Sequence, residues 1–202
     1  KHQFFDYILL VEDRLSKKYL ECTLSEIFEL NIPRYEIITI GGADKVFEIN
    51  RENKIYKYFG DAKIISIPDE DKKDKFEEYK DHKFIEIYIP VEKNIEDFIY
   101  KKYKMNDNKF VSQFEEFVNK KYYRGTLNSF KKIYEEKSAK NFFKDIGCQI
   151  ARETKNPINE TIEIFLSNEI TTDLVEFIFT YTNMSNEFKS FKGKLKSFFD
   201  EN

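Results

Sequence analysis

The feature that most constrains the fold is a regular alternation, through the first hundred residues, of short apolar runs with longer stretches of helical periodicity. The apolar runs predict strands at 7–12, 35–40, 63–67 and 84–89. Helical spacing predicts helices at 14–30, 44–58 and 95–103. Because parallel strands need a crossover, which is usually a right-handed helical one, the alternation predicts an α/β fold with a mostly parallel sheet flanked by helices.

The pattern changes near residue 107, where long helical stretches replace the alternation. Helices are predicted over 108–122, 126–153, 159–182 and 185–200. Breaks fall at Gly125, at Pro157 and in the Asn183–Asn186 region. We therefore expect two parts, an α/β domain over residues 1–106 and an all-helical C-terminal extension over residues 107–202.

Composition narrows the class of protein further. The 202 residues are 41% hydrophobic and 35% charged, which is enough apolar material for a real core. Cys22 and Cys148 lie far apart with no Cys-x-x-Cys pattern, so we expect no disulfide framework or zinc site and a reducing, cytoplasmic setting. No uncharged apolar run approaches the roughly 20 residues that span a bilayer, so no membrane partner is expected. Because a strand-like run begins soon after Lys1, we expect the chain to be a piece of a longer polypeptide.

Charge is segregated along the chain. Residues 1–100 carry 16 basic and 22 acidic side chains, residues 101–155 carry 14 and 7, and residues 156–202 carry 4 and 8. The acidic first part suits a carboxylate metal site, and the basic middle part suits a polyanionic partner. A solvated helix face explains such charge runs equally well, so both interpretations stay open here.

Three carboxylates lie at or just after the carboxyl ends of predicted strands, where parallel sheets usually bind their ligands. Glu12 ends the first predicted strand, and Asp69 and Asp71 follow the third. Residues two apart in extended chain face the same way, so Asp69 and Asp71 are expected to point together while Glu70 points away. Ligands gather at the carboxyl ends of such strands, and converging carboxylates repel unless a cation such as Mg²⁺ neutralises them. The alternatives are a helix-end charge for Glu12 and a solvated acidic turn for residues 69–81.

These residues also resemble a known family. Ile-Leu-Leu-Val-Glu at 8–12, Ile-Thr-Ile-Gly-Gly at 38–42 and Ile-Ile-Ser-Ile-Pro-Asp-Glu-Asp at 64–71 resemble the Toprim fold of topoisomerases, primases and overcoming-lysogenization-defect (OLD) nucleases. The segment Ile-Glu-Asp-Phe at 95–98 resembles the one that follows the fourth strand in OLD-type and related bacterial defence proteins. The resemblance covers about residues 5–105. The chain departs from it at Asp13, where the family usually has Gly, and at Ser16, where many OLD-type members have a second acidic residue.

The resemblance implies a function and a site. Residues 1–106 would form the Toprim-like catalytic domain of a metal-dependent, anti-phage endonuclease that cleaves or nicks DNA, works with an ATPase domain outside this piece and could form a homo-oligomer. Asp69 and Asp71 would bind Mg²⁺ or Mn²⁺, while Glu12 would bind a metal or manage a proton. Glu96 would be an added ligand or a helix-end charge. The Ser16 departure leaves open whether Asp13 substitutes as a ligand, whether one ion binds, or whether catalysis is lost.

A nucleic-acid contact is expected in the basic part, because Lys and Arg neutralise backbone phosphates without reading sequence. The candidates for this contact are Lys120, Lys121, Arg124, Lys131 and Lys132. The resemblance also implies a lysine near the scissile phosphate, for which the candidates are Lys137, Lys140 and Lys144.

Two other functions remain open at this point. The run Ile8–Asp13 also resembles the start of a two-component receiver domain, in which Asp69 would accept a phosphoryl group. Alternatively, the chain is a catalytically inactive interaction module whose carboxylates only cap helices.

Overall fold

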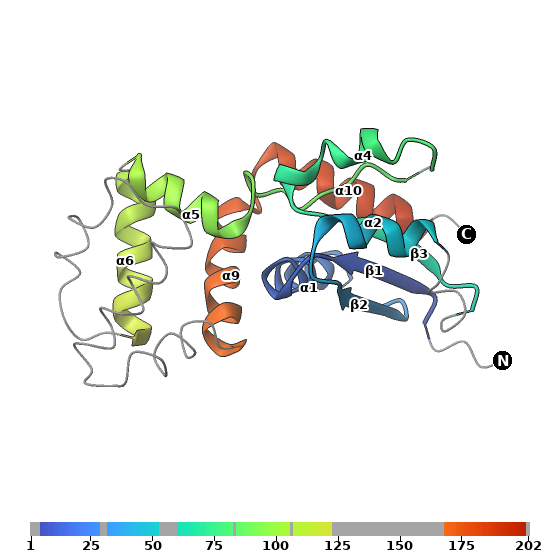
Figure 1. Cartoon of the computed structure of the whole chain (residues 1–202). Helices are drawn as coiled ribbons and strands as arrows, with labels where there is room; N and C mark the ends of the chain where they lie inside the picture. The colour runs from blue at the N-terminus through green and yellow to red at the C-terminus, as the bar shows by residue number, and fades with distance from the viewer. Residues whose placement is uncertain are drawn as a thin grey trace, which may run out of the picture. The chain divides into compact units, whose positions relative to one another are not determined.

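The computed structural model describes residues 5–28, 32–52, 60–82, 84–105, 107–122 and 168–200 (Figure 1). The chain divides into two compact units, one formed by residues 1–94 with 178–202 and the other by residues 95–177. The first unit contains the sheet and the second is helical in its described residues. No helix of the described residues is both long enough and apolar enough to cross a membrane.

A three-stranded parallel sheet forms the centre of the first unit. Its strands are β1 (Tyr7–Val11), β2 (Tyr35–Thr39) and β3 (Lys63–Ile67), in the order β2-β1-β3. Val11 lies opposite both Thr39 of β2 and Ile67 of β3, so all three strands end at the same edge. The prediction of an α/β fold with a parallel sheet is thereby confirmed.

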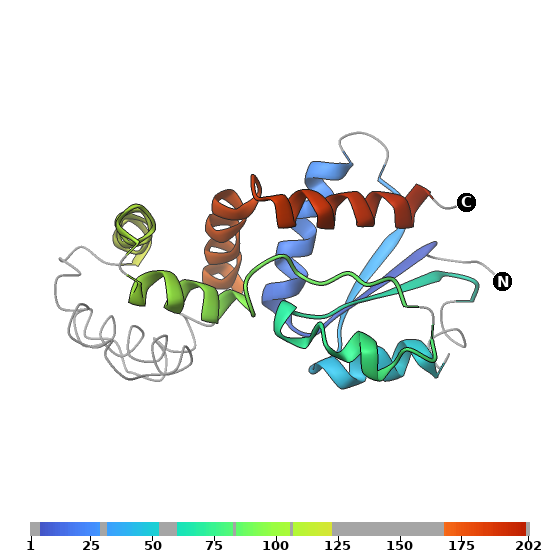
Figure 2. The same cartoon turned by 90° about the horizontal axis from the view of Figure 1, so that it is seen from above.

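Helices cover both faces of this sheet. α1 (Arg14–Ile27) and α10 (Asn186–Asp200) lie on one face, and α2 (Ala43–Arg51) lies on the other (Figure 2). Alternate residues of β1 supply the two faces: Ile8 and Leu10 belong to the same buried cluster as Val46 of α2, while Tyr7 packs against α10. β1 is buried on both sides, which explains why its sequence is a continuous apolar run rather than an alternating one.

The strand order fixes where a ligand site is expected. β2 and β3 lie on opposite sides of β1, so the first crossover leaves β1 in one direction and the next returns past it in the other. Because the strand order reverses direction at β1, the carboxyl end of this strand is where ligands bind in sheets of this kind. Glu12 is the residue that follows β1.

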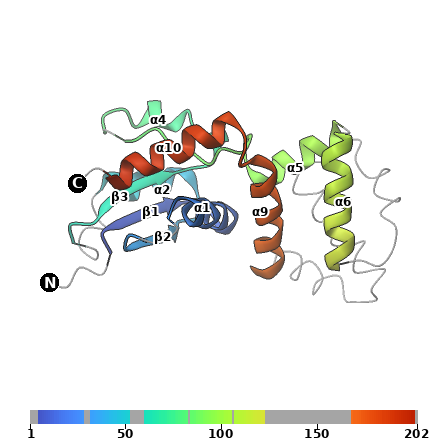
Figure 3. The same cartoon turned by 180° about the vertical axis from the view of Figure 1, so that it is seen from behind.

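The last helix, α10, completes the first unit rather than the helical extension. Its apolar side chains are buried, and the Tyr7 hydroxyl donates a 2.9 Å hydrogen bond to the carbonyl of Phe199. The helix runs alongside α1 and the sheet (Figure 3). Lys192 of α10 also pairs with Glu26 of α1. The first unit therefore does not end at the predicted boundary between residues 106 and 107. It also includes α10, whose buried side chains pack against β1, the first strand of the chain.

The fourth predicted strand, 84–89, does not join the sheet in the described part of the chain. Its last residue, Ile89, donates a 2.9 Å backbone hydrogen bond to Pro68, but Lys194 of α10 takes the carbonyl of Glu86. Ile87 and Ile89 are buried while Ile85 is exposed, so the segment packs one end against the unit without forming a ladder.

The second unit is built around aromatic side chains. It contains α5 (Ile95–Lys104), α6 (Asn108–Tyr122) and the first ten residues of α9 (Asn168–Thr182), whose last five belong to the first unit. Phe110 and Phe114 of α6 stack on each other, and Phe177 of α9 contacts both rings. The helix predicted over 126–153 and the start of the one predicted over 159–182 lie outside the described residues.

Candidate functional site

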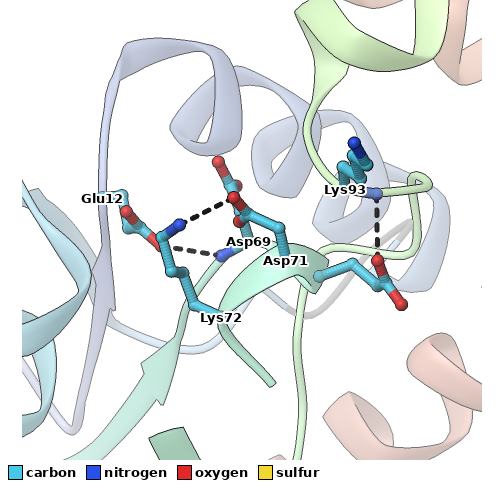
Figure 4. A network of polar contacts seen from close by, with 6 residues as sticks. Glu12, Asp69, Asp71, Lys72 and Lys93 are labelled. Carbon is cyan, nitrogen blue, oxygen red and sulfur yellow. Dashed lines mark hydrogen bonds and ion pairs between the residues drawn. The ribbon is translucent and has the colours of Figure 1, made fainter. Parts of the chain in front are cut away.

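The candidate site lies at the shared carboxyl edge of β1 and β3. Because Val11 and Ile67 are in register, the residues that follow them, Glu12 and Pro68-Asp69, lie side by side. The Glu12 carboxylate accepts a 3.0 Å hydrogen bond at Oε1 from the backbone N–H of Asp69 (Figure 4). This bond ties the end of β1 to the start of the acidic loop.

Asp69 is the most perturbed carboxyl group of the site. Its Oδ1 accepts a 2.7 Å hydrogen bond from the Ser16 hydroxyl, near the start of α1. Burial raises the pKa of Asp69 to about 8, and the nearby charges of Asp13, Glu12 and Asp71 act in the same direction, while the Ser16 bond opposes them. At neutral pH the Asp69 carboxyl is therefore largely protonated.

Glu12 is shifted in the same direction. Burial raises its pKa above the ordinary value, the bond from the Asp69 N–H opposes this, and the charge of Asp71 raises the pKa again. The positive charge of Lys72 lowers the Glu12 pKa. Glu12, Asp69 and Asp71 are thus close enough to repel one another, which is the electrostatic condition that a shared cation relieves.

Asp71 has a cationic partner within the protein. Its Oδ2 lies 2.7 Å from Nζ of Lys72, and both side chains are partly exposed. The pKa of Lys72 is raised first by its bond to Asp71, and the charges of Asp71, Glu12 and Asp69 also raise it. Figure 4 shows the Lys72 side chain extending toward Glu12 and Asp71. The ammonium group therefore supplies positive charge to the same three carboxylates.

Glu70 faces away from this group. Its carboxylate bonds Nζ of Lys73 at 2.7 Å and the backbone N–H of Lys93 at 3.0 Å, and the Lys73 bond is the main reason that its pKa is lowered. Glu70 points away for a reason other than the predicted strand alternation. Asp69 has an extended backbone, but Glu70–Lys72 form η1, a single 3₁₀ turn, so the run from Asp69 to Asp71 is not a continuous strand. Lys93 has a positive φ of 62° and also accepts the Asp71 N–H, so the loop after residue 89 is pinned to this turn.

Asp13 has a structural role. It is the N-cap of α1, and its side chain accepts a 2.9 Å hydrogen bond from the Ser16 N–H. Asp13 contributes charge to the site, because it raises the pKa of both Asp69 and Glu12, while its Oδ1 is held by the helix.

The carboxylates are neighbours but do not form a ready-made cage. Within residues 5–28, 32–52, 60–82, 84–105, 107–122 and 168–200, no group of three or more His, Cys, Asp or Glu could hold a metal ion as it stands. Asp69 is bonded to Ser16, and Asp71 to Lys72. The donor chemistry nevertheless fits Mg²⁺ or Mn²⁺, since the three candidate ligands are oxygen donors whose repulsion a positive group already offsets.

The other sequence-predicted residues are not brought into this site by the described contacts. Glu96 belongs to α5, and Lys120 and Lys121 belong to α6, both in the second unit, and their side chains are not among those that the structure describes. Arg124, Lys131, Lys132, Lys137, Lys140 and Lys144 lie outside the described residues.

Sequence reasoning missed the roles of two residues, Ser16 and Lys72. The sequence pointed to Ser16 only because many OLD-type proteins have an acidic residue at this position. In the structure Ser16 is buried, and its hydroxyl donates a hydrogen bond to Asp69. Lys72 directly follows the Asp-Glu-Asp run, and that adjacency was the only signal available for it.

Comparison with known proteins adds no relative. A scan against protein-family models, a search of curated proteins and a search of solved structures each gave no match.

Proposed function

We propose that this chain carries a Toprim-type, metal-dependent nuclease site that hydrolyses phosphodiester bonds in nucleic acid, with DNA as the substrate. The observation that carries the proposal is the position of Glu12, Asp69 and Asp71 at the carboxyl ends of β1 and β3, where Asp71 raises the pKa of both Glu12 and Asp69, and Glu12 raises the pKa of Asp69. The motif resemblance supports the same site, and the basic segment 101–155 supports a polyanionic substrate.

The proposed ligands of the ion are Asp69 and Asp71, with Glu12 as a further ligand or as a proton acceptor. A divalent cation held there supplies positive charge to the phosphoryl group and makes water a stronger nucleophile near neutral pH. Glu12 stands beside the Asp69 backbone and has a raised pKa, which suits a group that takes a proton from attacking water. Asp69 must give up its proton to become a ligand, since a metal binds the carboxylate form.

The proposal extends to the setting of the protein. We infer an OLD-like anti-phage system in which this module works with an ATPase domain outside the present chain. This part rests on the motif resemblance and on no contact of the described residues.

A nicking assay tests the site. Supercoiled plasmid is incubated with Mg²⁺ or Mn²⁺ and wild type, Glu12→Gln or Asp69→Asn, with Glu77→Gln as a control because Glu77 is an exposed residue of α4 (Lys75–Glu78). We expect both site variants to lose activity by about a hundredfold or more, and the control to retain it. Equal activity in all four proteins, or none in wild type, would reject the proposed site.

The same proteins discriminate the two alternatives. A receiver-like domain would be labelled on Asp69 by acetyl phosphate and would not cleave DNA. An inactive interaction module would show neither labelling nor cleavage, while wild type and variants would keep the same fold by circular dichroism.

A further inference from the structure

Lys72 is placed where a metal ion would have to compete with it. Its Nζ lies 2.7 Å from Asp71, and its charge also acts on Glu12 and Asp69. These three residues are the proposed ligands. The neighbouring Lys73 points elsewhere and pairs with Glu70 at 2.7 Å. The chain thus offers two adjacent lysines: Lys72 extends toward the carboxylates (Figure 4), whereas Lys73, the C-cap of the same turn, pairs with Glu70.

We propose that Lys72 is an internal counter-cation. It stabilises the cluster of Glu12, Asp69 and Asp71 when no metal ion is bound, and it has to leave Asp71 before a divalent cation can bind there. The inference rests on the proposed function, because it assumes that Glu12, Asp69 and Asp71 are the ligands. It goes beyond that function by assigning the chain a built-in competitor that sets the affinity for the metal.

Two physical arguments support the competition. The ammonium group occupies Oδ2 of Asp71, so a metal ion has to bind this carboxylate through Oδ1 alone or displace the lysine. The positive charge also repels an approaching dication across a few ångströms of partly buried protein, where screening is weaker than in water. The lysine lies on a 3₁₀ turn and is partly exposed, so its flexible side chain can swing away without moving the backbone.

Lys72 also has a role in the folded protein when no metal ion is bound. Without a metal ion, the carboxylates of the site repel one another, and the Lys72 ammonium, 2.7 Å from Oδ2 of Asp71, offsets part of this repulsion. Lys72 therefore favours the metal-free state and opposes the metal-bound one.

Isothermal titration calorimetry with Mn²⁺ tests the proposal on the intact chain at pH 7.5 and low ionic strength. The proteins are wild type, Lys72→Met, Lys72→Arg and the control Lys73→Met, which removes the same charge one residue away. We expect Lys72→Met to bind Mn²⁺ roughly tenfold more tightly than wild type, and the gain to shrink at high salt. Lys72→Arg and Lys73→Met should stay within about threefold of wild type.

A second measurement keeps the test decisive if Lys72→Met binds poorly for a structural reason. Thermal unfolding without metal should show a lower Tm for Lys72→Met than for Lys73→Met, and saturating Mn²⁺ should remove that difference. Equal Mn²⁺ affinity for wild type and Lys72→Met, or a weaker affinity in a variant that is fully folded, would overturn the competition while leaving the metal site intact. Absence of Mn²⁺ binding in all four proteins would instead overturn the metal site of the proposed function, and the role of Lys72 with it.

Discussion

Ser16 is the residue through which helix α1 acts on the candidate site. Its N–H is bound by the N-cap Asp13, and its hydroxyl donates to Asp69, so one residue joins the start of the helix to the acidic loop. A donor that bonds the charged form of a carboxyl group lowers the pKa of that group. Ser16 therefore limits how far burial raises the pKa of Asp69.

Replacing Ser16 with Ala should raise the pKa of Asp69 further above its present value of about 8. The substitution removes the hydroxyl that bonds the carboxylate, while burial and the neighbouring charges remain, so the protonated form of Asp69 is favoured further. Ser25→Ala is the matched control, since Ser25 is exposed on the same helix and bonds only to the carbonyl of Glu21 among the contacts described. Carbon-13 NMR titration of the aspartate carboxyl groups measures the change, and an unaltered or lower Asp69 pKa in Ser16→Ala would contradict it.

The raised pKa of Asp69 predicts how the free energy of unfolding depends on pH. The ordinary pKa of an aspartate is 3.8 and that of Asp69 is about 8, so between these values the folded state holds a proton that the unfolded state releases. The contribution of this group to the free energy of unfolding is therefore fully present below about pH 4 and is lost as the pH rises through 8. Asp69→Asn cannot titrate at this position and should lack this dependence.

Urea unfolding of the metal-free protein at pH 5.5 and pH 8.5 measures the effect. Wild type should lose about 2 kcal/mol more than Asp69→Asn between the two pH values, after allowance for the partial exposure of the group. Comparing the two proteins removes the contributions of other carboxyl groups, such as Glu70, whose lowered pKa changes the stability with pH in the opposite sense. Parallel pH profiles for the two proteins would show that Asp69 is not protonated in the folded state.

At the scale of elements, the sequence predicts best what local periodicity controls. The three strands, their parallel pairing and the positions of α1, α2, α5, α6 and α10 follow from apolar runs and helical spacing. The edge that brings Glu12 beside Asp69 also follows, because parallel strands end together. The contact between Glu12 and the start of the acidic loop was therefore predictable from the strand ends.

What the sequence did not reveal depends on partners that are far away in the chain. The run 84–89 has the alternation of a strand, but an α10 lysine takes one of its carbonyls and no ladder forms. The Asp-Glu-Asp run reads as extended chain, yet it closes into a 3₁₀ turn whose backbone is held by residue 93. Neither Lys194 nor Lys93 gives a local signal of these contacts, so periodicity could not find them.

At the scale of the whole molecule, the first unit is discontinuous in sequence. β1 begins the unit and α10 closes it, and Phe199 joins them, because its ring lies 4.7 Å from that of Tyr7 and 5.0 Å from that of Phe28. Residues 95–177, which separate the two parts of this unit in the sequence, form a compact unit of their own. Stability of the candidate site should therefore depend on a helix close to the end of the chain and much less on α6.

Hydrogen exchange of Phe199→Ala tests this dependence. Truncating a buried Phe in a close-packed cluster should cost about 3–5 kcal/mol of the free energy of unfolding, so amide exchange in β1, α1 and β3 should accelerate together. Exchange in α6 should stay as in wild type, because its core of Phe110 and Phe114 belongs to the other unit. Lys196→Ala, an exposed change on the same helix, should leave both units unaffected. Faster exchange in α6 as well would mean that the two units unfold as one, and the site would then depend on the whole chain rather than on its first unit.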